Sequence, residues 1–249
     1  MRPIPPELVY GFDAVIHLSG ENVAGRWTEA KKKRIRDSRV LSTLNLSNAL
    51  VNAVQQPKTF VCASAIGYYG NRGDEILTED SPSGDGFLAD VCREWEAATE
   101  PAAHVGICTV NLRTGLVLSR EGGALKQMLL PFRLGLGGSI GDGGQWWSWI
   151  HIEDFVAAIH HILQNDAIKG AVNMTAPNAV TNIEFTQTLA NTLKRPAILP
   201  IPAFAARMAF GEFADEGLLA SARVQPTKLT ARKFEFKFPG LEAALRALI

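Results

Sequence analysis

A serine and two adjacent tyrosines form the segment of this sequence that most resembles a catalytic pattern. Ser64 follows an apolar run, and Tyr68 and Tyr69 come shortly after it. A hydroxyl can orient a substrate oxygen, and a phenol can transfer a proton if a neighbouring cation lowers its pKa from about 10. No lysine occurs between Lys58 and Lys126. The segment predicts a site at Ser64, Tyr68 and Tyr69 without such a cation; the alternative is that the tyrosines only cap a core edge.

Arginines stand where an anionic ligand can be held. Arg113 ends the apolar run at 105–112, at the carboxyl edge where parallel sheets bind ligands. This position predicts that Arg113 either contacts a ligand or anchors an ion pair. Arg34 and Arg39 lie on the helix expected after the first strand, and a guanidinium fork suits a phosphate. Arg34 is better explained as an ordinary solvated charge.

Aromatic residues gather in the segment "QWWSWIH" at 145–151. Trp146, Trp147 and Trp149 can form a platform for a flat ligand or a sugar, or can pack the sheet against a C-terminal lobe. His151 is interpreted as a hydrogen-bonded structural residue. No metal site is predicted from the histidines.

Composition excludes several classes of partner. The 249 residues carry 25 Lys plus Arg and 25 Asp plus Glu, so no net charge attracts nucleic acid or an anionic membrane. Cys62, Cys92 and Cys108 are widely spaced in apolar surroundings, as is typical of free thiols in a reducing compartment. With no apolar run of membrane-spanning length, we expect a cytoplasmic protein that acts on a small molecule, and a homo-oligomer is compatible with this.

Apolar segments of strand and helix character alternate along the chain. Strands are expected at 13–18, 59–63, 105–112 and 170–174, and helices at 28–54, 87–98, 124–134 and 153–163. This order predicts an α/β protein with a doubly wound parallel sheet. Prolines and the alternating "KFEFKF" change the character of the chain after residue 194. We therefore expect a domain at 1–194 and a small C-terminal α/β region at 195–249 on the substrate side.

A glycine-rich phosphate loop is not recognisable. The stretch "GLGGSIGDGG" at 135–144 follows a helix and leads into the tryptophan segment, so no helix N-terminus follows it to bind a pyrophosphate. It is interpreted as a substrate-side loop or a structural turn.

Several motifs together resemble a known family. The stretches "DAVIHLSGEN", "SRVLST", "SAIGYYG", "LRTGLVLSREGGAL" and "WIHIEDF" are similar to an atypical branch of the extended short-chain dehydrogenase/reductases, catalogued as NAD(P)-dependent nucleoside-diphosphate-sugar epimerases. The resemblance implies a Rossmann-like fold, NADP or NAD as cofactor, and a substrate that includes nucleotide-sugars. It also implies that Leu18, Ser19 and Gly20 lie beside the adenosine and ribose of the cofactor, and the "SRV" match favours Arg39 as a cofactor contact. The family pattern does not fix Arg34, which stays a candidate cofactor contact by residue type, as Arg113 does by its place at the strand end.

The chain departs from the family pattern in two places. Phe87 and Val91 stand where the family's Tyr-x-x-x-Lys pair is expected, so the usual catalytic triad is absent. The family's first strand and its GGTGFIG turn, about fifty residues before the first matched motif, are also missing. We expect cofactor binding to need that segment, and a sheet edge to be left uncovered. The leading hypothesis is an NAD(P)-dependent oxidoreductase or epimerase-like protein; the alternative is a non-catalytic, nucleotide-responsive binding protein.

Overall fold

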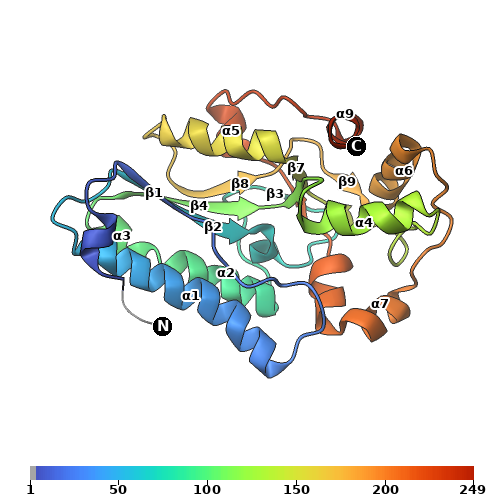
Figure 1. Ribbon diagram of the computed structural model, residues 1–249, viewed down its shortest axis with the longest axis horizontal. Helices are drawn as coiled ribbons and strands as arrows, with labels where there is room; N and C mark the ends of the chain where they lie inside the picture. Colours follow the sequence, from blue (N-terminus) through green and yellow to red (C-terminus); the bar gives the residue numbers. More distant parts are fainter. Residues whose placement is uncertain (1–3) are drawn as a thin grey trace.

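A four-stranded parallel sheet forms the centre of the molecule in the computed structural model, which describes residues 4–249 (Figure 1). Its strands lie in the order β1 (Ala14–His17), β2 (Thr59–Ala65), β4 (Cys108–Thr114) and β8 (Gly170–Met174). All neighbouring strands are parallel. The predicted α/β fold with a doubly wound parallel sheet is confirmed, and the nearly continuous apolar sequence of β2 reflects burial on both faces.

One face of the sheet is covered by α1 (Glu29–Val51), α2 (Phe87–Ala97) and α3 (Glu100–His104) (Figure 1). Helix α1 begins after Thr28, whose side chain accepts a hydrogen bond from the Lys31 backbone N–H, as an N-cap should. Leu50 of α1 and Trp95 of α2 pack against Phe60 of β2 in one buried cluster. This packing fixes α2, and therefore the residues at its N-terminus, relative to the sheet.

The opposite face carries α5 (Ile152–Leu163) and the short α8 (Thr227–Ala231). Ile162 of α5 and Leu229 of α8 belong to a buried cluster with Leu112 and Val172 of the sheet. Phe234 and its neighbour Phe236, from the "KFEFKF" segment, pack against the same cluster. That segment is therefore packed against α5 and the sheet and forms no strand of its own.

A second layer of structure lies beyond the carboxyl ends of the strands (Figure 1). Helices α4 (Gly123–Arg133), α6 (Asn182–Leu193) and α9 (Leu241–Leu248) share one buried cluster with Trp149. The remaining elements are short: η1 (Pro6–Val9), η2 (Ile66–Tyr69), β3 (Ile76–Leu77) with β10 (Arg223–Val224), β5 (Leu116–Leu118) with β7 (Trp149–His151), β6 (Trp146–Trp147) with β9 (Val180–Thr181), α7 (Ala203–Phe210) and the π-helical turn Ala214–Leu218. Apart from η1, which packs against the end of α1, these elements lie around the carboxyl edge of the sheet.

The C-terminal region does not lie apart from the rest of the chain. Leu245 of α9 is buried among residues of α4 and α6, and Leu229 of α8 is buried against the sheet. The division at residues 194 and 195 stays a prediction. Within residues 4–249, no helix combines the length and the hydropathy needed to cross a membrane.

Candidate functional site

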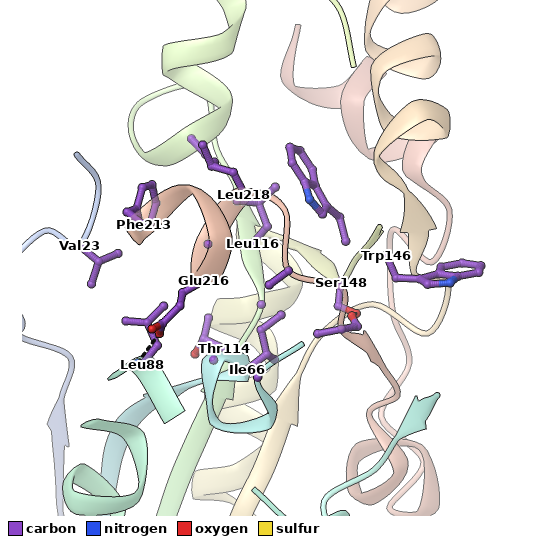
Figure 2. Close-up of a pocket in the computed structure, with 18 of the residues that line it drawn as sticks. Val23, Ile66, Leu88, Thr114, Leu116, Trp146, Ser148, Phe213, Glu216 and Leu218 are labelled. Atoms are coloured by element: carbon purple, nitrogen blue, oxygen red, sulfur yellow. Dashed lines mark hydrogen bonds between the residues drawn. The ribbon is translucent and has the colours of Figure 1, made fainter. Parts of the chain in front are cut away.

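A cavity of about 300 Å³ lies at the carboxyl ends of β2 and β4 (Figure 2). Its wall combines the turn after β2, the β4–β5 junction, helix α4, the β6 segment and the chain from the π-helical turn onward. The lining residues are mostly apolar: Val23, Ile66, Gly67, Gly70, Leu88, Thr114, Gly115, Leu116, Ala124, Met128, Trp146, Trp147, Ser148, Phe213, Glu216, Gly217, Leu218, Ala220 and Ala222. This is the edge where open parallel sheets bind ligands.

Two glycines allow the chain to build this wall. Gly70 ends the single turn η2 with a φ of 65°, a conformation that favours glycine. A Cβ atom on Gly115 would lie 2.5 Å from the backbone oxygen of Ser148, so only glycine permits the β4–β5 junction to approach the β6–β7 segment this closely. The backbone conformation at Gly70 and the close approach of two segments at Gly115 thus explain why both positions are glycine.

Glu216 places a carboxylate on the cavity wall at the N-terminus of α2. Its two oxygens accept hydrogen bonds from the backbone N–H groups of Phe87, at 2.9 Å, and Leu88, at 2.7 Å. Helix α2 begins after Gly86, which has no side chain to cap it, so Glu216 supplies the acceptors that the first turn needs. Figure 2 shows Glu216 directed at Leu88. Glu216 is the one ionisable residue among those that line the cavity.

Glu216 belongs to no recognisable sequence motif. It lies 129 residues after Phe87, and only the fold brings the two together. The sequence offered one indirect signal, since Gly86 leaves α2 without a local cap. That signal indicates that a partner is needed but does not identify it.

Ser64, Tyr69 and Arg113 are brought together, but inside the protein rather than on the cavity wall. Arg113 donates from Nε and Nη2 to the two oxygens of Glu96, both at 2.9 Å, and Ser64 Oγ donates to Glu96 Oε1 at 2.7 Å. Arg113 Nη1 donates to Tyr69 Oη at 3.1 Å. Burial opposes the charged guanidinium, but the hydrogen bonds and charge of Glu96 raise the pKa of Arg113. Arg113 thus forms a buried ion pair with Glu96, as the second of its two predicted roles requires.

The two neighbouring tyrosines lie in different environments. Tyr69 is fully buried, and its Oη is 2.7 Å from Asn173 Oδ1; burial raises its pKa above the ordinary value. Tyr68 is half-buried, with its ring stacked on the Arg113 guanidinium at 3.5 Å from Cζ to the ring centre. It lines a separate polar groove beside Asn111. The catalytic roles expected for Ser64, Tyr68 and Tyr69 stay predictions.

The turn after β1 is open to solvent, as the expected cofactor contact requires. Leu18, Ser19 and Gly20 are all exposed. Arg39 of α1 packs against this turn. The Arg39 Nη1 donates to the backbone oxygen of Glu21 at 3.0 Å, and a Cβ atom on Gly20 would lie 3.0 Å from Arg39 Cζ. The Arg39 guanidinium therefore holds the turn.

Arg34 lies at the same end of α1 but is less constrained. Its side chain is 59% exposed, and its Nε is 3.7 Å from the Glu21 carboxylate. Lys31 contacts the same carboxylate at 2.7 Å and lowers its pKa. The positions of both arginines are compatible with the cofactor roles expected of them, which stay predictions.

The aromatic segment divides between packing and the cavity. Trp149 is fully buried in the cluster beneath α4, whereas Trp146 and Trp147 line the cavity. His151 is buried, its Nδ1 accepts from the Glu153 backbone N–H at 3.1 Å, and its ring lies 3.9 Å from that of Phe238. The structural interpretation of His151 agrees with this arrangement, and burial lowers its pKa.

Comparison with known proteins identifies the family. Residues 7–175 match the family described as "NAD dependent epimerase/dehydratase family", and residues 201–248 match a "domain of unknown function (DUF1731)". The chain belongs to the NAD dependent epimerase/dehydratase family. The predicted resemblance to an atypical extended short-chain dehydrogenase/reductase is thereby confirmed.

Relatives of this epimerase-family chain match nearly all of it. An "epimerase family protein" of Mycobacterium bovis is 44% identical over 96% of this chain and 79% of its own length, and human SDR39U1 is 40% identical over 95% and 82%. The solved structure of human SDR39U1 "with NADPH" superposes with a TM-score of 0.90, at 36% identity, over 99% of this chain and 88% of that one. A nucleoside-diphosphate sugar epimerase from Corynebacterium glutamicum gives 0.80, at 35% identity, over 100% and 51%.

The residues of this epimerase-family chain are compatible with the two ends of a nicotinamide dinucleotide. An apolar cavity beside the β2 and β4 ends suits the flat nicotinamide ring, and the exposed turn Leu18–Gly20 at the end of β1 leaves room for the adenosine ribose. Glycine at position 20 allows close approach to that turn. Within residues 4–249, no strand leads into a helix through a Gly-x-Gly-x-x-Gly turn that would hold a pyrophosphate.

Proposed function

We propose that this epimerase-family protein binds NADP(H) and catalyses hydride transfer between it and the carbonyl or alcohol carbon of a small molecule in the cavity. The observation that carries the proposal is the apolar cavity at the carboxyl ends of β2 and β4. Family membership supports the cofactor class, and the human relative solved with NADPH favours the phosphorylated form. Sugar-nucleotide epimerisation, the activity named for the Corynebacterium relative, is the other reaction to be tested.

Each part of the site receives a defined role in this proposal. When bound, NADPH would supply the hydride for carbonyl reduction, and NADP⁺ would accept it from an alcohol carbon. Leu18, Ser19 and Gly20 would contact the adenosine ribose, and the backbone around Ile66 and Gly115 would support the nicotinamide ring. The substrate oxygen gains or loses a proton, and Glu216 is the one ionisable lining residue that can hold it. Each carboxylate oxygen of Glu216 has acceptor capacity beyond its one backbone hydrogen bond.

The buried network acts as a positioning device in this proposal. Ser64 and Arg113 face each other across β2 and β4, and Glu96 ties both to α2. Tyr69 connects the network to the turn η2, which forms part of the cavity wall. These residues hold η2 and the N-terminus of α2 at a constant separation, so that a ring bound between them meets a rigid wall.

Cofactor binding is tested by titration of the protein with NADPH and NADH, followed by nicotinamide fluorescence. We expect saturable binding that is tighter for NADPH. Ser19→Asp places a negative charge on the exposed turn and should weaken binding about tenfold or more, because it repels the cofactor phosphates. Gln55→Asp is the matched control, since it adds the same charge before β2, at the opposite end of the sheet. Binding by the unmodified protein would show that the Gly-rich turn, which the sequence led us to expect as a requirement, is not needed for the cofactor; lack of binding would contradict the proposal.

Two observations favour a second candidate, a nucleotide-responsive binding protein without catalysis. Phe87 and Val91 occupy the positions expected for a proton-transferring pair, and the Tyr69 phenol is buried with a raised pKa. The two candidates differ in turnover. For the enzyme, Glu216→Gln should lower the rate of carbonyl-dependent NADPH oxidation and leave NADPH affinity unchanged. NADPH binding without turnover of any carbonyl or sugar nucleotide would favour the binding protein.

A further inference from the structure

Apolar side chains make up most of the cavity wall. Leu116 comes from β5, Met128 from α4, Trp147 from β6, and Phe213 and Leu218 from the segment around the π-helical turn. These side chains belong to four separate parts of the chain, so their convergence is a property of the fold and not of one apolar stretch. Figure 2 shows Leu116, Phe213 and Leu218 around the same space.

The polar side chains on the wall are already hydrogen-bonded within the protein. Ser148 Oγ donates to the Ala222 oxygen at 2.8 Å and accepts from the Val224 N–H at 2.9 Å. Thr114 Oγ1 donates to the Leu112 oxygen at 3.0 Å. Because these hydroxyls already hydrogen-bond to backbone groups, they have little capacity left for hydrogen bonds to a bound ligand.

The indole on the wall is already hydrogen-bonded in the same way, because Trp146 Nε1 donates to Asp74 at 2.7 Å. Each oxygen of Glu216 accepts one backbone N–H from the start of α2, so this carboxylate can still accept from one reacting hydroxyl. A sugar ring carries several hydroxyls, and most of them would lose their hydration without gaining a hydrogen-bond partner among these side chains.

Charge also opposes a sugar nucleotide in this space. The lining residues include no lysine and no arginine, and the one charged group is the Glu216 carboxylate. A diphosphate needs cations or free backbone N–H donors, and here the α2 N-terminus is already occupied by Glu216. A cavity of about 300 Å³ also lies at the small end of the range for ligand sites.

We propose that the group held in this cavity is uncharged and apolar, an aromatic or cyclic alkyl group attached to the reacting carbonyl, and not a nucleotide-sugar. This specificity rests on the proposed hydride-transfer function. A flat ring would contact Trp147 and Phe213, and Met128 would adapt to its outline. The reacting carbonyl would then lie at the end of the cavity nearest Ile66 and Gly115.

Calorimetry on the protein saturated with NADP⁺ tests this proposal, because the oxidised cofactor cannot reduce an aldehyde. Benzaldehyde and cyclohexanecarbaldehyde are titrated against UDP-glucose. We expect both aldehydes to bind saturably and UDP-glucose to bind at least about tenfold more weakly. Tighter binding of UDP-glucose, or no binding of either aldehyde, would overturn the proposal.

Two variants locate the binding in this cavity. Ala124→Trp fills the space and should abolish aldehyde binding, whereas Ala209→Trp on the exposed side of α7 should leave it unchanged. Met128→Gln keeps the side-chain size but adds a polar amide, and should weaken aldehyde binding about tenfold even if Ala124→Trp does not fold. Unchanged binding in Met128→Gln would count against the proposal.

The NADPH titration separates the two proposals. If the unmodified protein binds NADPH but neither aldehyde, the apolar specificity fails and the proposed function stands. If it binds no NADPH, the proposed function itself fails.

Discussion

At the scale of single residues, the pairing of Arg113 with Glu96 decides what Ser64 and Tyr69 can do. Both charged side chains are nearly buried, at 5% and 14% exposure, and both bonds of the fork are made. A buried charge is tolerated only with a well-placed partner, so loss of one member of the pair should also destabilise the other member and the residues hydrogen-bonded to it. The hydroxyls of Ser64 and Tyr69 are therefore engaged in hydrogen bonds to this ion pair.

Removal of one member of the pair tests this. Glu96→Ala leaves the Arg113 guanidinium buried without a counter-charge and should lower the free energy of unfolding by about 3–5 kcal/mol. Glu94→Ala, two residues earlier on α2, removes a similar fork to Arg36 at the surface and should cost less than about 1 kcal/mol. Urea unfolding followed by circular dichroism measures both. Equal losses would show that burial of the pair is unimportant.

The buried thiols predict how stability depends on pH. Burial raises the pKa of Cys62 and of Cys92 to about 12, from an ordinary value of 9.0. As pH rises above 9, the unfolded chain loses thiol protons that the folded protein keeps, so the stability present below pH 9 is lost between pH 9 and 12. Each thiol should contribute a slope of about 1.4 kcal/mol per pH unit in that window.

The Cys92→Ala variant separates this contribution from other groups that titrate in the same range. Its free energy of unfolding should fall less steeply above pH 9 than that of the unmodified protein, even though its stability at neutral pH is lower. Cys108→Ala, at a half-buried thiol, should change the slope less. Chemical denaturation at a series of pH values measures the slopes, and parallel curves for Cys92→Ala and the unmodified protein would contradict the prediction.

At the scale of elements, the N-terminus of α2 links the C-terminal part of the chain to the sheet. The helix starts at Phe87 without a local side-chain cap, and Glu216 provides its acceptors from the π-helical turn. The same helix carries Glu96 at its other end and packs Trp95 against β2. One helix therefore connects the cavity wall to the buried ion pair.

The cap makes a prediction about local stability. Glu216→Ala should lower the free energy of unfolding by about 1 kcal/mol and speed hydrogen exchange at the Phe87 and Leu88 amides, which lose their acceptor. Glu212→Ala, which breaks only a surface pair to Lys32, is the control and should leave both amides protected. Exchange resolved by NMR or mass spectrometry reports the effect; unchanged exchange in Glu216→Ala would contradict the assigned role.

At the scale of the whole molecule, the C-terminal helix α9 shares a buried cluster with α4 and α6. Leu245 and Ala244 of α9 are fully buried beside Phe185 of α6 and Leu125 of α4. The buried cluster therefore contains residues from both sides of the division expected at 194 and 195. A shared core implies that both parts unfold together.

This predicts one unfolding transition for the entire chain. Leu245→Ala should cost about 2–5 kcal/mol and shift that single transition without splitting it. Leu136→Ala makes the same change at a side chain that is 57% exposed and should cost less than about 0.5 kcal/mol. Calorimetry that showed two separate transitions would support independent domains instead.

The sequence by itself determined the elements and their layering. Apolar runs such as 59–63 and 170–174 predicted buried parallel strands, and the helix at Phe87 was placed correctly, because burial pattern and element type are encoded locally. The matched motifs also led to the family. The approach of Ser64 to Arg113 follows from two strand ends that meet at the same edge.

Tertiary structure alone decided which of those groups face the cavity. Glu96 fills the space between Ser64 and Arg113, and Glu216 reaches α2 from 129 residues away. Hydrogen-bond partners and burial depend on contacts between distant segments, and no spacing along the chain specifies them. For this reason the sequence predicted a site at the strand ends, whereas only the fold placed an apolar cavity there and directed the Tyr69 hydroxyl into the interior.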